Sequence, residues 1–272
     1  MYEDENLFMT HTVTYTTKNH IAYITLNRPE VDNIINQQIA QELIDICCQV
    51  NQDDNIYVAV VTGAGDKAFC GGSEFERLIQ TSNTSELRLS KLNGVSTVYN
   101  AARAVASIEQ PVIAAINGDA MGEGLELALS CDIRLSSVNA RFGLPQMASG
   151  LIPMGGGTQR LPRIIGRTKA MELILTAETI NAEEALEIGL VSQVVSQEKL
   201  ASEAENLAQT IASKAPIASR YAKEAVNKGM NLTLEQGLRL EADLYLLLHT
   251  TADRTEGIKA FLQKRPPRFK GQ

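Results

Sequence analysis

Two glutamates stand three residues apart in the segment NGDAMGEGLELALSCD, residues 117–132. The segment follows an apolar run at 111–116 that predicts a buried strand, and its own apolar spacing predicts a helix. Residues three apart share a face of a helix, so Glu123 and Glu126 would lie on one side. Carboxylates held in this way can take and return protons as general acids and bases.

The two glutamates have different alternatives to a catalytic role. For Glu126 the alternative is a solvated charge, but its neighbours Leu125, Leu127, Ala128 and Leu129 are all apolar. A buried, isolated carboxylate costs free energy unless it is paired or used, so the pattern favours a functional Glu126. For Glu123 we favour the simpler explanation, because a first-turn carboxylate stabilises many helix starts electrostatically.

Glycines gather at two places that come after predicted strands. Gly71 and Gly72 precede Ser73, and Gly122 and Gly124 flank Glu123. Backbone N–H groups from two such segments could converge into an oxyanion hole, which stabilises an enolate or a tetrahedral oxyanion. Tight turns that need a positive φ would use the same glycines. Spacing alone does not favour either interpretation.

Other catalytic patterns are weak or missing. GAGDKAFCGG contains G-x-G-x-x-A after a strand, but the residues directly after it do not resemble a helix start, which disfavours a dinucleotide site. There is no phosphate-binding G-x-x-x-x-G-K-[ST] and no G-x-S-x-G nucleophile motif. The three histidines lack the spacing of metal ligands, so no metal site is predicted.

The composition is that of an ordinary globular protein. The 272 residues are 44% hydrophobic and carry a net charge of −7, which disfavours nucleic acid as a partner. No apolar run reaches about 18 residues, so we expect no membrane span. The first residues lack the order of a signal peptide, and the four cysteines form no CxxC pair. The predicted location is cytoplasmic.

Hydrophobic periodicity predicts an α/β core and then a series of helices. Strands are expected at 12–17, 21–26, 56–62, 111–116, 132–135 and 190–195, and helices at 35–50, 86–106, 158–165, 168–176, 181–188, 199–214, 216–229, 233–250 and 254–264. We divide the chain into a core at 1–200 and a C-terminal helical region at 201–272.

Several ordered motifs together resemble the enoyl-CoA hydratase/isomerase (crotonase) superfamily. They are ITLNRP (24–29), VVTGAGDKAFCGGSEF (60–75), PVIAAINGDAMGEGLELALSCDIRL (111–135), ARFGLPQMASGLIPMGGGTQRLPRIIG (140–166) and EGIKAFLQKRPPRFK (256–270). The resemblance implies a spiral of ββα units, a helical trimerisation region, and a homotrimer or dimer of trimers. It also implies an acyl-CoA substrate, with coenzyme A as part of the substrate and no permanently bound cofactor.

Carried over by position, the resemblance assigns the parts of a site. The backbone N–H groups of Ser73 and Glu123 would form the oxyanion hole, bordered by Gly71, Gly72 and Gly122, and Glu126 would be a catalytic carboxylate. The family usually has glycine at Glu123, so this side chain either narrows the site or points outward. Substrate-binding positions are Arg28 near the pantetheine entrance, and Phe261 and Lys264 near the adenine, often from a neighbouring subunit.

Two positions depart from the hydratase pattern. Gln146 stands where a second catalytic glutamate is expected, and Met154 replaces a glycine near the catalytic water. An amide can orient water but cannot hold or release a proton at neutral pH. The basic side chains within 254–272 are either a solvated helix end or an attraction for the CoA phosphates, and the polar segment 76–92 is predicted to be a mobile lid.

The sequence therefore predicts a hydratase that adds water to a 2-enoyl-CoA. Glu126 would move protons, and Gln146 would orient the water. The alternatives are an enoyl-CoA isomerase or another single-carboxylate enolate reaction, and a catalytically weak acyl-CoA-binding protein.

Overall fold

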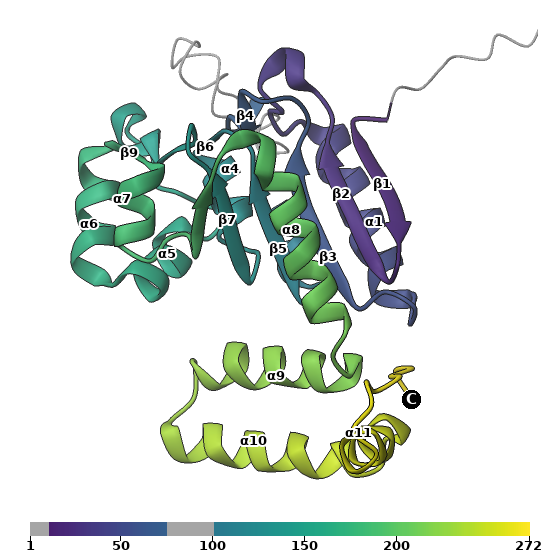
Figure 1. Ribbon diagram of the computed structural model, residues 1–272. Helices are drawn as coiled ribbons and strands as arrows, with labels where there is room; N and C mark the ends of the chain where they lie inside the picture. The colour runs from purple at the N-terminus through teal and green to yellow at the C-terminus, as the bar shows by residue number, and fades with distance from the viewer. Residues whose placement is uncertain (1–10, 75–100) are drawn as a thin grey trace, which may run out of the picture.

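The larger of two sheets runs through the middle of the protein (Figure 1). The computed structural model describes residues 11–74 and 101–272. Within them this sheet has the order β1-β2-β3-β5-β7-β10, formed by Val13–Lys18, Ile21–Leu26, Val58–Gly63, Val112–Ile116, Ile133–Ser137 and Gln193–Val195. Strands β1 and β2 are an antiparallel hairpin, and the other neighbours pair in parallel. All six strands overlap predicted ones.

The hairpin turn depends on two residues that tolerate a left-handed backbone. Lys18 pairs with Ile21, so Asn19 and His20 form a two-residue loop. Both have positive φ, 51° and 66°, as a type I′ turn requires.

The smaller sheet contains strands of only three residues. In the order β4-β6-β8-β9 they are Ala68–Cys70, Asp119–Met121, Arg141–Gly143 and Thr179–Asn181. The first three are parallel. The segments that come after β4, β6 and β8 therefore leave the sheet at one edge. This sheet was not predicted.

Helices cover both faces of the larger sheet, as its nearly continuous apolar strands require. On one face α1 (Gln37–Gln52) starts at Asn36, whose side chain accepts the N–H of Ile39, and it packs its apolar side chains into the main core. On the other face α8 (Gln197–Ala212) places Leu200, Ala204 and Ala208 against β2, β3, β5 and β7.

The other described helices lie around the two sheets (Figure 1). They are η1 (Pro29–Val31), the described helical stretch at 101–106, α4 (Glu123–Ala128), η4 (Pro145–Ser149), α5 (Gly157–Ile165), α6 (Arg167–Thr176), α7 (Ala182–Glu187), α9 (Pro216–Gly229), α10 (Leu234–Leu248) and α11 (Ala252–Leu262). The last three form a layer of their own. This confirms the predicted α/β core with C-terminal helices.

The structure bears in different ways on the dinucleotide motif, on the segment 76–106 and on the domain boundary. The G-x-G-x-x-A segment does not lead from β3 into a helix, because β4 comes directly after it, so the disfavoured dinucleotide motif has no βα context. The predicted helix at 86–106 is described only from residue 101, and the predicted lid at 76–92 lies outside the described residues. The boundary at residue 200 falls inside α8, and the division into two domains stays a prediction.

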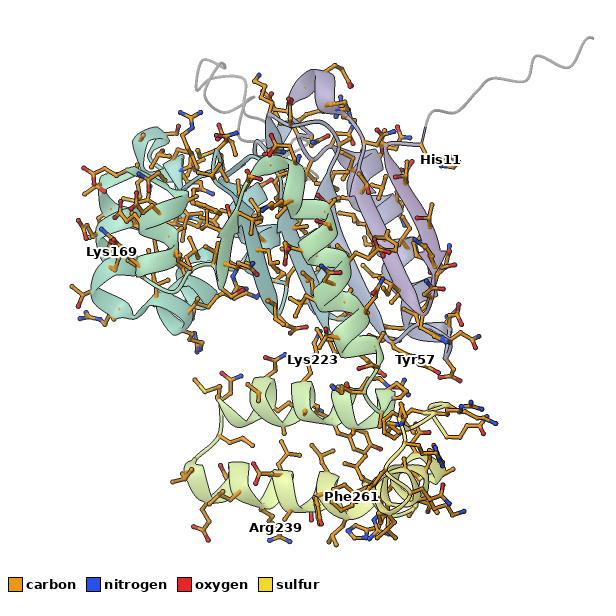
Figure 2. The ribbon with its side chains drawn as sticks, viewed as in Figure 1. His11, Tyr57, Lys169, Lys223, Arg239 and Phe261 are labelled. Carbon is orange, nitrogen blue, oxygen red and sulfur yellow. The ribbon has the colours of Figure 1, made fainter. Side chains whose placement is uncertain are left out.

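One largely buried ion pair fastens the helical layer to the sheet. Lys223 of α9 points toward the sheet in Figure 2, and its Nζ lies 2.7 Å from Oδ2 of Asp132 and 2.9 Å from the carbonyl of Gln110. The same carboxylate oxygen accepts the N–H of Val112 at 2.8 Å. Such charge-assisted hydrogen bonds are stronger than neutral ones.

We expect Lys223→Met to lower the free energy of unfolding by about 1–3 kcal/mol, because Asp132 then loses its cation in a largely buried place. The matched control is Lys228→Met on the same helix. The Lys223 side chain is 11% exposed, whereas that of Lys228, paired with Glu224, is 65% exposed, so the control should lose much less. Urea unfolding of both variants measures the difference, and equal losses would contradict this role of Lys223.

Candidate active site

Glu126 is completely buried at the first turns of α4. It has 0% exposure, so the solvated alternative is wrong. Oε1 accepts the backbone N–H of Gly157 at 2.7 Å, and Nε2 of Gln146 lies 3.5 Å from Oε2. Each carboxylate oxygen thus faces an N–H donor, and these contacts offset part of the cost of removing the group from water.

The start of α4 lies directly against the end of β4. A Cβ atom at Gly124 would stand 2.0 Å from the carbonyl oxygen of Cys70, a separation no side chain could occupy. The close approach brings the helix start to the segment after Cys70. Gly72 and Gly122 have φ values of 110° and 53°, so both are also turns that favour glycine. The turn interpretation is therefore confirmed for these two, and it is compatible with an oxyanion hole.

The backbone of Ser73 is oriented by its pairing with Ile35. In this parallel bridge Ile35 donates its N–H to Gly72 at 2.9 Å and accepts the N–H of Glu74 at 3.0 Å. Both hydrogen bonds use residues on either side of Ser73, so the N–H of Ser73 points away from Ile35. The residue is buried, with 1% exposure. The role of this N–H as an oxyanion donor stays a prediction.

The Glu123 side chain is not directed into solvent. It is the first residue of α4 after the Gly122 turn, and it is only 5% exposed. The outward-pointing alternative for this departure from the family pattern is therefore wrong. A buried carboxylate now lies beside the backbone N–H that the resemblance assigns to the oxyanion hole.

Gln146 enters from the third strand of the smaller sheet. It lies in η4, which comes after β8, and it is 4% exposed. While Nε2 faces Glu126, Oε1 is buried and accepts no hydrogen bond within the part of the chain that the structure describes. A buried carbonyl oxygen without a donor costs free energy. This oxygen suits an O–H or N–H donor supplied by a ligand or a water molecule.

A glycine-rich loop closes around the carboxylate of Glu126. A Cβ atom at Gly155 would lie 3.2 Å from Oε2, and one at Gly157 would lie 3.1 Å from Oε1 and 2.8 Å from Cβ of Pro153. Met154, in the same loop, is 39% exposed. Gly157 is a functional contact that the sequence analysis missed. The available signal was the triple glycine at the start of a predicted helix.

Arg28 lies beside the Ser73 segment. Its guanidinium is 3.0 Å from Oε1 of Glu74 and 3.3 Å from the carbonyl of Ile34. Phe261 and Lys264 belong instead to α11 and its end, in the separate helical layer, where Phe261 is 83% exposed (Figure 2). The structure therefore places Phe261 in a different layer from Glu126, and the contact of Phe261 and Lys264 with CoA stays a prediction.

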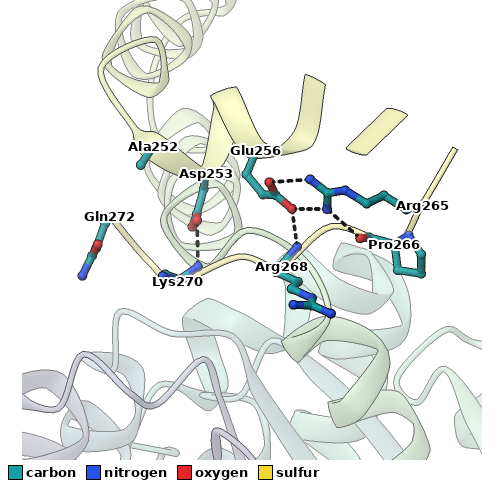
Figure 3. Close-up of a pocket in the computed structure, with 8 residues that line it drawn as sticks. All are labelled: Ala252, Asp253, Glu256, Arg265, Pro266, Arg268, Lys270 and Gln272. Atoms are coloured by element: carbon teal, nitrogen blue, oxygen red, sulfur yellow. Dashed lines mark hydrogen bonds and ion pairs between the residues drawn. The ribbon is translucent and has the colours of Figure 1, made fainter. Parts of the chain in front are cut away.

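The basic C-terminal segment folds back onto α11 (Figure 3). Arg265 holds Glu256 through two contacts of 2.6 and 2.9 Å, and the N–H of Arg268 adds a third at 2.8 Å. Hydrogen bonds from Arg265 lower the pKa of Glu256 to about 2. A cavity of about 770 Å³ is lined here by Ala252, Asp253, Glu256, Arg265, Pro266, Arg268, Lys270 and Gln272. Arg265 is thus paired with Glu256 in the same chain. This pairing disfavours Arg265 as one of the side chains predicted to attract the CoA phosphates.

The described residues show no group of three or more His, Cys, Asp or Glu placed to hold a metal ion. None of the described helices has the length and apolar character needed to cross a membrane.

Known proteins share this fold, and their similarity extends over nearly the whole chain. The sequence model of the enoyl-CoA hydratase/isomerase family matches residues 16–272. The crystal structure of an enoyl-CoA hydratase from Bacillus anthracis has a TM-score of 0.90 at 41% identity, covering 96% of this chain and 100% of that one. The chain therefore belongs to the enoyl-CoA hydratase/isomerase family, as its motifs predicted, and it has the crotonase fold.

Two similar members of the family are named as hydratases of CoA thioesters. It is 41% identical over 259 residues to an (E)-benzylidenesuccinyl-CoA hydratase of Thauera aromatica, covering 95% of this chain and 99% of that protein. It is 40% identical over 249 residues to a crotonyl-CoA hydratase of Syntrophomonas wolfei, covering 92% and 94%.

We expect Gly124→Ala to destabilise the protein by about 1–3 kcal/mol or more, because the new methyl group collides with the carbonyl of Cys70. Gly229→Ala in α9 is the matched control, since a Cβ there meets nothing within 4 Å and alanine favours the helix. Thermal unfolding measures both variants. A Gly124→Ala protein as stable as the control would contradict the close approach of α4 to β4.

Proposed function

We propose that this protein adds water across the 2,3 double bond of a 2-enoyl-CoA thioester, giving a 3-hydroxyacyl-CoA. The observation that carries the proposal is the buried Glu126, held between Gly157 and Gln146 at the start of α4. Membership of the family supports the substrate class, and the hydratases among its relatives support the reaction.

The proposed reaction uses one carboxylate for both proton transfers. Glu126 takes a proton from water while the water oxygen bonds to Cβ, and the π electrons of the double bond move onto the thioester oxygen. The N–H groups of Ser73 and Glu123 stabilise that enolate. Glu126 then returns its proton to Cα, the carbonyl re-forms, and the enzyme is unchanged. Oε1 of Gln146 accepts an O–H of the water and so orients it.

Binding of the substrate completes the proposal. Arg28, beside Glu74, lies near the pantetheine entrance, and Gly71, Gly72, Gly122 and Met154 border the reacting thioester. Coenzyme A comes with the substrate, and the reaction needs no bound cofactor.

The proposed location is the cytoplasm. The four cysteines are all thiols rather than disulfides, which is typical of a cytoplasmic enzyme; they are Cys47, Cys48, Cys70 and Cys131.

We also propose a homotrimer or a dimer of trimers. The support is the large apolar side chains that the helical layer exposes, namely Val226, Met230, Leu232, Leu234, Leu238, Tyr245, Leu246, Leu247, Ile258, Phe261 and Leu262. Exposed apolar surface of this extent marks an interface. In the assembly, Phe261 and Lys264 of one subunit would contact the CoA bound to another.

Isomerisation is the second candidate, and the single catalytic carboxylate, Glu126, is the observation that favours it, although family isomerases often carry their lone glutamate at the position of Gln146. A site with one carboxylate suits a 1,3-proton shuttle that moves a double bond between positions 3 and 2. Identifying the product separates the two reactions, because only hydration yields a 3-hydroxyacyl-CoA.

We expect Glu126→Gln to lower kcat by about 10²-fold or more, since the amide cannot take a proton from water. The loss of the conjugated thioester absorbance with a panel of 2-enoyl-CoAs measures the rate. Glu183→Gln is the matched control, because Glu183 is an exposed carboxylate in the first turn of α7 and has no part in the proposed reaction. Equal rates for Glu126→Gln and the parent would exclude Glu126 as the catalytic group.

We expect Gln146→Glu to raise the hydration rate about tenfold or more. Two carboxyl groups this close do not both ionise readily, so one would hold a proton and could deliver it to Cα as a general acid. Gln146→Leu is the companion variant and should be slower than the parent, because it cannot orient the water. If the leucine variant matched the parent, Gln146 would have no part in the reaction.

A further inference from the structure

A pair of consecutive non-glycine residues with positive φ lies beside the proposed oxyanion hole. Asp32 and Asn33 are consecutive and have φ values of 60° and 53°, in the left-handed region that L-residues seldom occupy. Asparagine and aspartate tolerate this region better than most residues, and Asn19 and His20 adopt it in the hairpin turn. Asp32 and Asn33 do not form a two-residue hairpin loop, so here the conformation depends on contacts with the surroundings. The segment therefore has a conformation that its neighbours must impose.

The Asn33 side chain is what imposes it. It is 0% exposed, and its amide makes three hydrogen bonds to three different parts of the chain. Oδ1 accepts the N–H of Arg28 at 2.9 Å, and Nδ2 donates to the carbonyls of Ala64 at 2.9 Å and Ala68 at 2.8 Å. The amide thus ties the 28–33 loop to the turn after β3 and to the start of β4.

The segment that Asn33 holds is also the template for the backbone around Ser73. The carbonyl of Asp32 accepts the N–H of Gly71 at 2.8 Å. Ile35 then bonds on both sides of Ser73, through the carbonyl of Gly72 and the N–H of Glu74. The path of 71–74, and with it the direction of the Ser73 N–H, is set by the path of 32–35.

We propose that Asn33 is a positioning residue that aims the Ser73 N–H at the thioester oxygen. The inference rests on the proposed function, because it assumes that this N–H is an oxyanion donor. Asn33 touches no substrate atom and acts through the 32–35 segment. Since a catalytic group displaced by about 1 Å can cost about 10²-fold in rate, loosening this segment should impair catalysis more than folding.

Asn33→Gly tests the inference, because glycine adopts the left-handed backbone without strain but lacks the amide. We expect kcat to fall about 10²-fold with KM changed little, which is the pattern for a contact that acts in the transition state. The second readout is the red shift that a bound cinnamoyl-CoA undergoes when its thioester carbonyl is polarised. This shift should shrink in the variant, whereas a merely structural role would leave it unchanged.

Gln110→Met is the control, because it removes another buried side-chain amide, 1% exposed, which donates to the carbonyl of Val50. Gln110 lies just before β5, at the strand end opposite the one that leads to Asn117 and β6. It should lower stability while leaving kcat and the red shift intact. If Asn33→Gly does not fold, Asn33→Ser gives the same two readouts with a smaller loss of hydrogen bonding.

The outcomes separate this inference from the function beneath it. An active parent with an Asn33 variant of equal kcat and equal red shift overturns the positioning role alone. A parent that shows neither turnover nor a red shift with 2-enoyl-CoAs overturns the proposed function, and the inference with it. If the parent polarises the thioester without hydrating it, the red shift alone tests the positioning role. A smaller shift in Asn33→Gly supports that role, and an equal shift overturns it.

Discussion

A carboxylate shut away from water must keep hydrogen-bond donors on its oxygens, and much of this fold supplies them to Glu126. Gly157 donates from the start of α5, and Gln146 approaches from η4. The loop between them fits because Gly155 and Gly157 present no Cβ to the carboxylate. An acidic group with 0% exposure thus receives backbone and amide donors on its two oxygens, which suits a group that must exchange a proton.

The smaller sheet brings the Ser73 segment, Glu126 and Gln146 to one place. Its strands β4, β6 and β8 are parallel and adjacent, so the chain leaves all three at the same edge. After β4 comes the Ser73 segment, after β6 comes Glu126, and after β8 comes Gln146. The short strands are part of the main core, to which they contribute Phe69, Ala120 and Phe142. The site therefore depends on the register of three short strands.

Periodicity reveals the larger sheet but not the smaller one, for a physical reason. Five or six apolar or alternating residues, as in β2 and β5, stand out from their surroundings, whereas three residues such as Ala68–Cys70 show no period. Burial of Glu126 could be predicted because its helical neighbours are apolar. The Gly157 donor and the Asn33 amide could not, because a backbone N–H and a turn asparagine look the same in sequence whether or not they hold a site. The predicted contact of Phe261 with CoA could not be tested in the same way, because in the proposed assembly it joins two subunits.

The two ends of the Gln146 amide explain how one carboxylate can serve a reaction for which the hydratase pattern has two. Gly157 donates to Oε1 of Glu126 at 2.7 Å, whereas Nε2 of Gln146 faces Oε2 at the longer distance of 3.5 Å, so in the proposed reaction Oε2 is the better placed oxygen for the proton. The amide oxygen at the other end of the same group is the buried acceptor that orients water in the proposed reaction. In the proposed reaction the planar amide of Gln146 therefore fixes the position of the water relative to the carboxylate that takes its proton. The water oxygen and the returned proton must reach Cβ and Cα from the side of Glu126. In the proposed reaction Glu126 is the only carboxyl group that supplies the proton for Cα, so protonation of Cα uses the proton that the same group has taken from water.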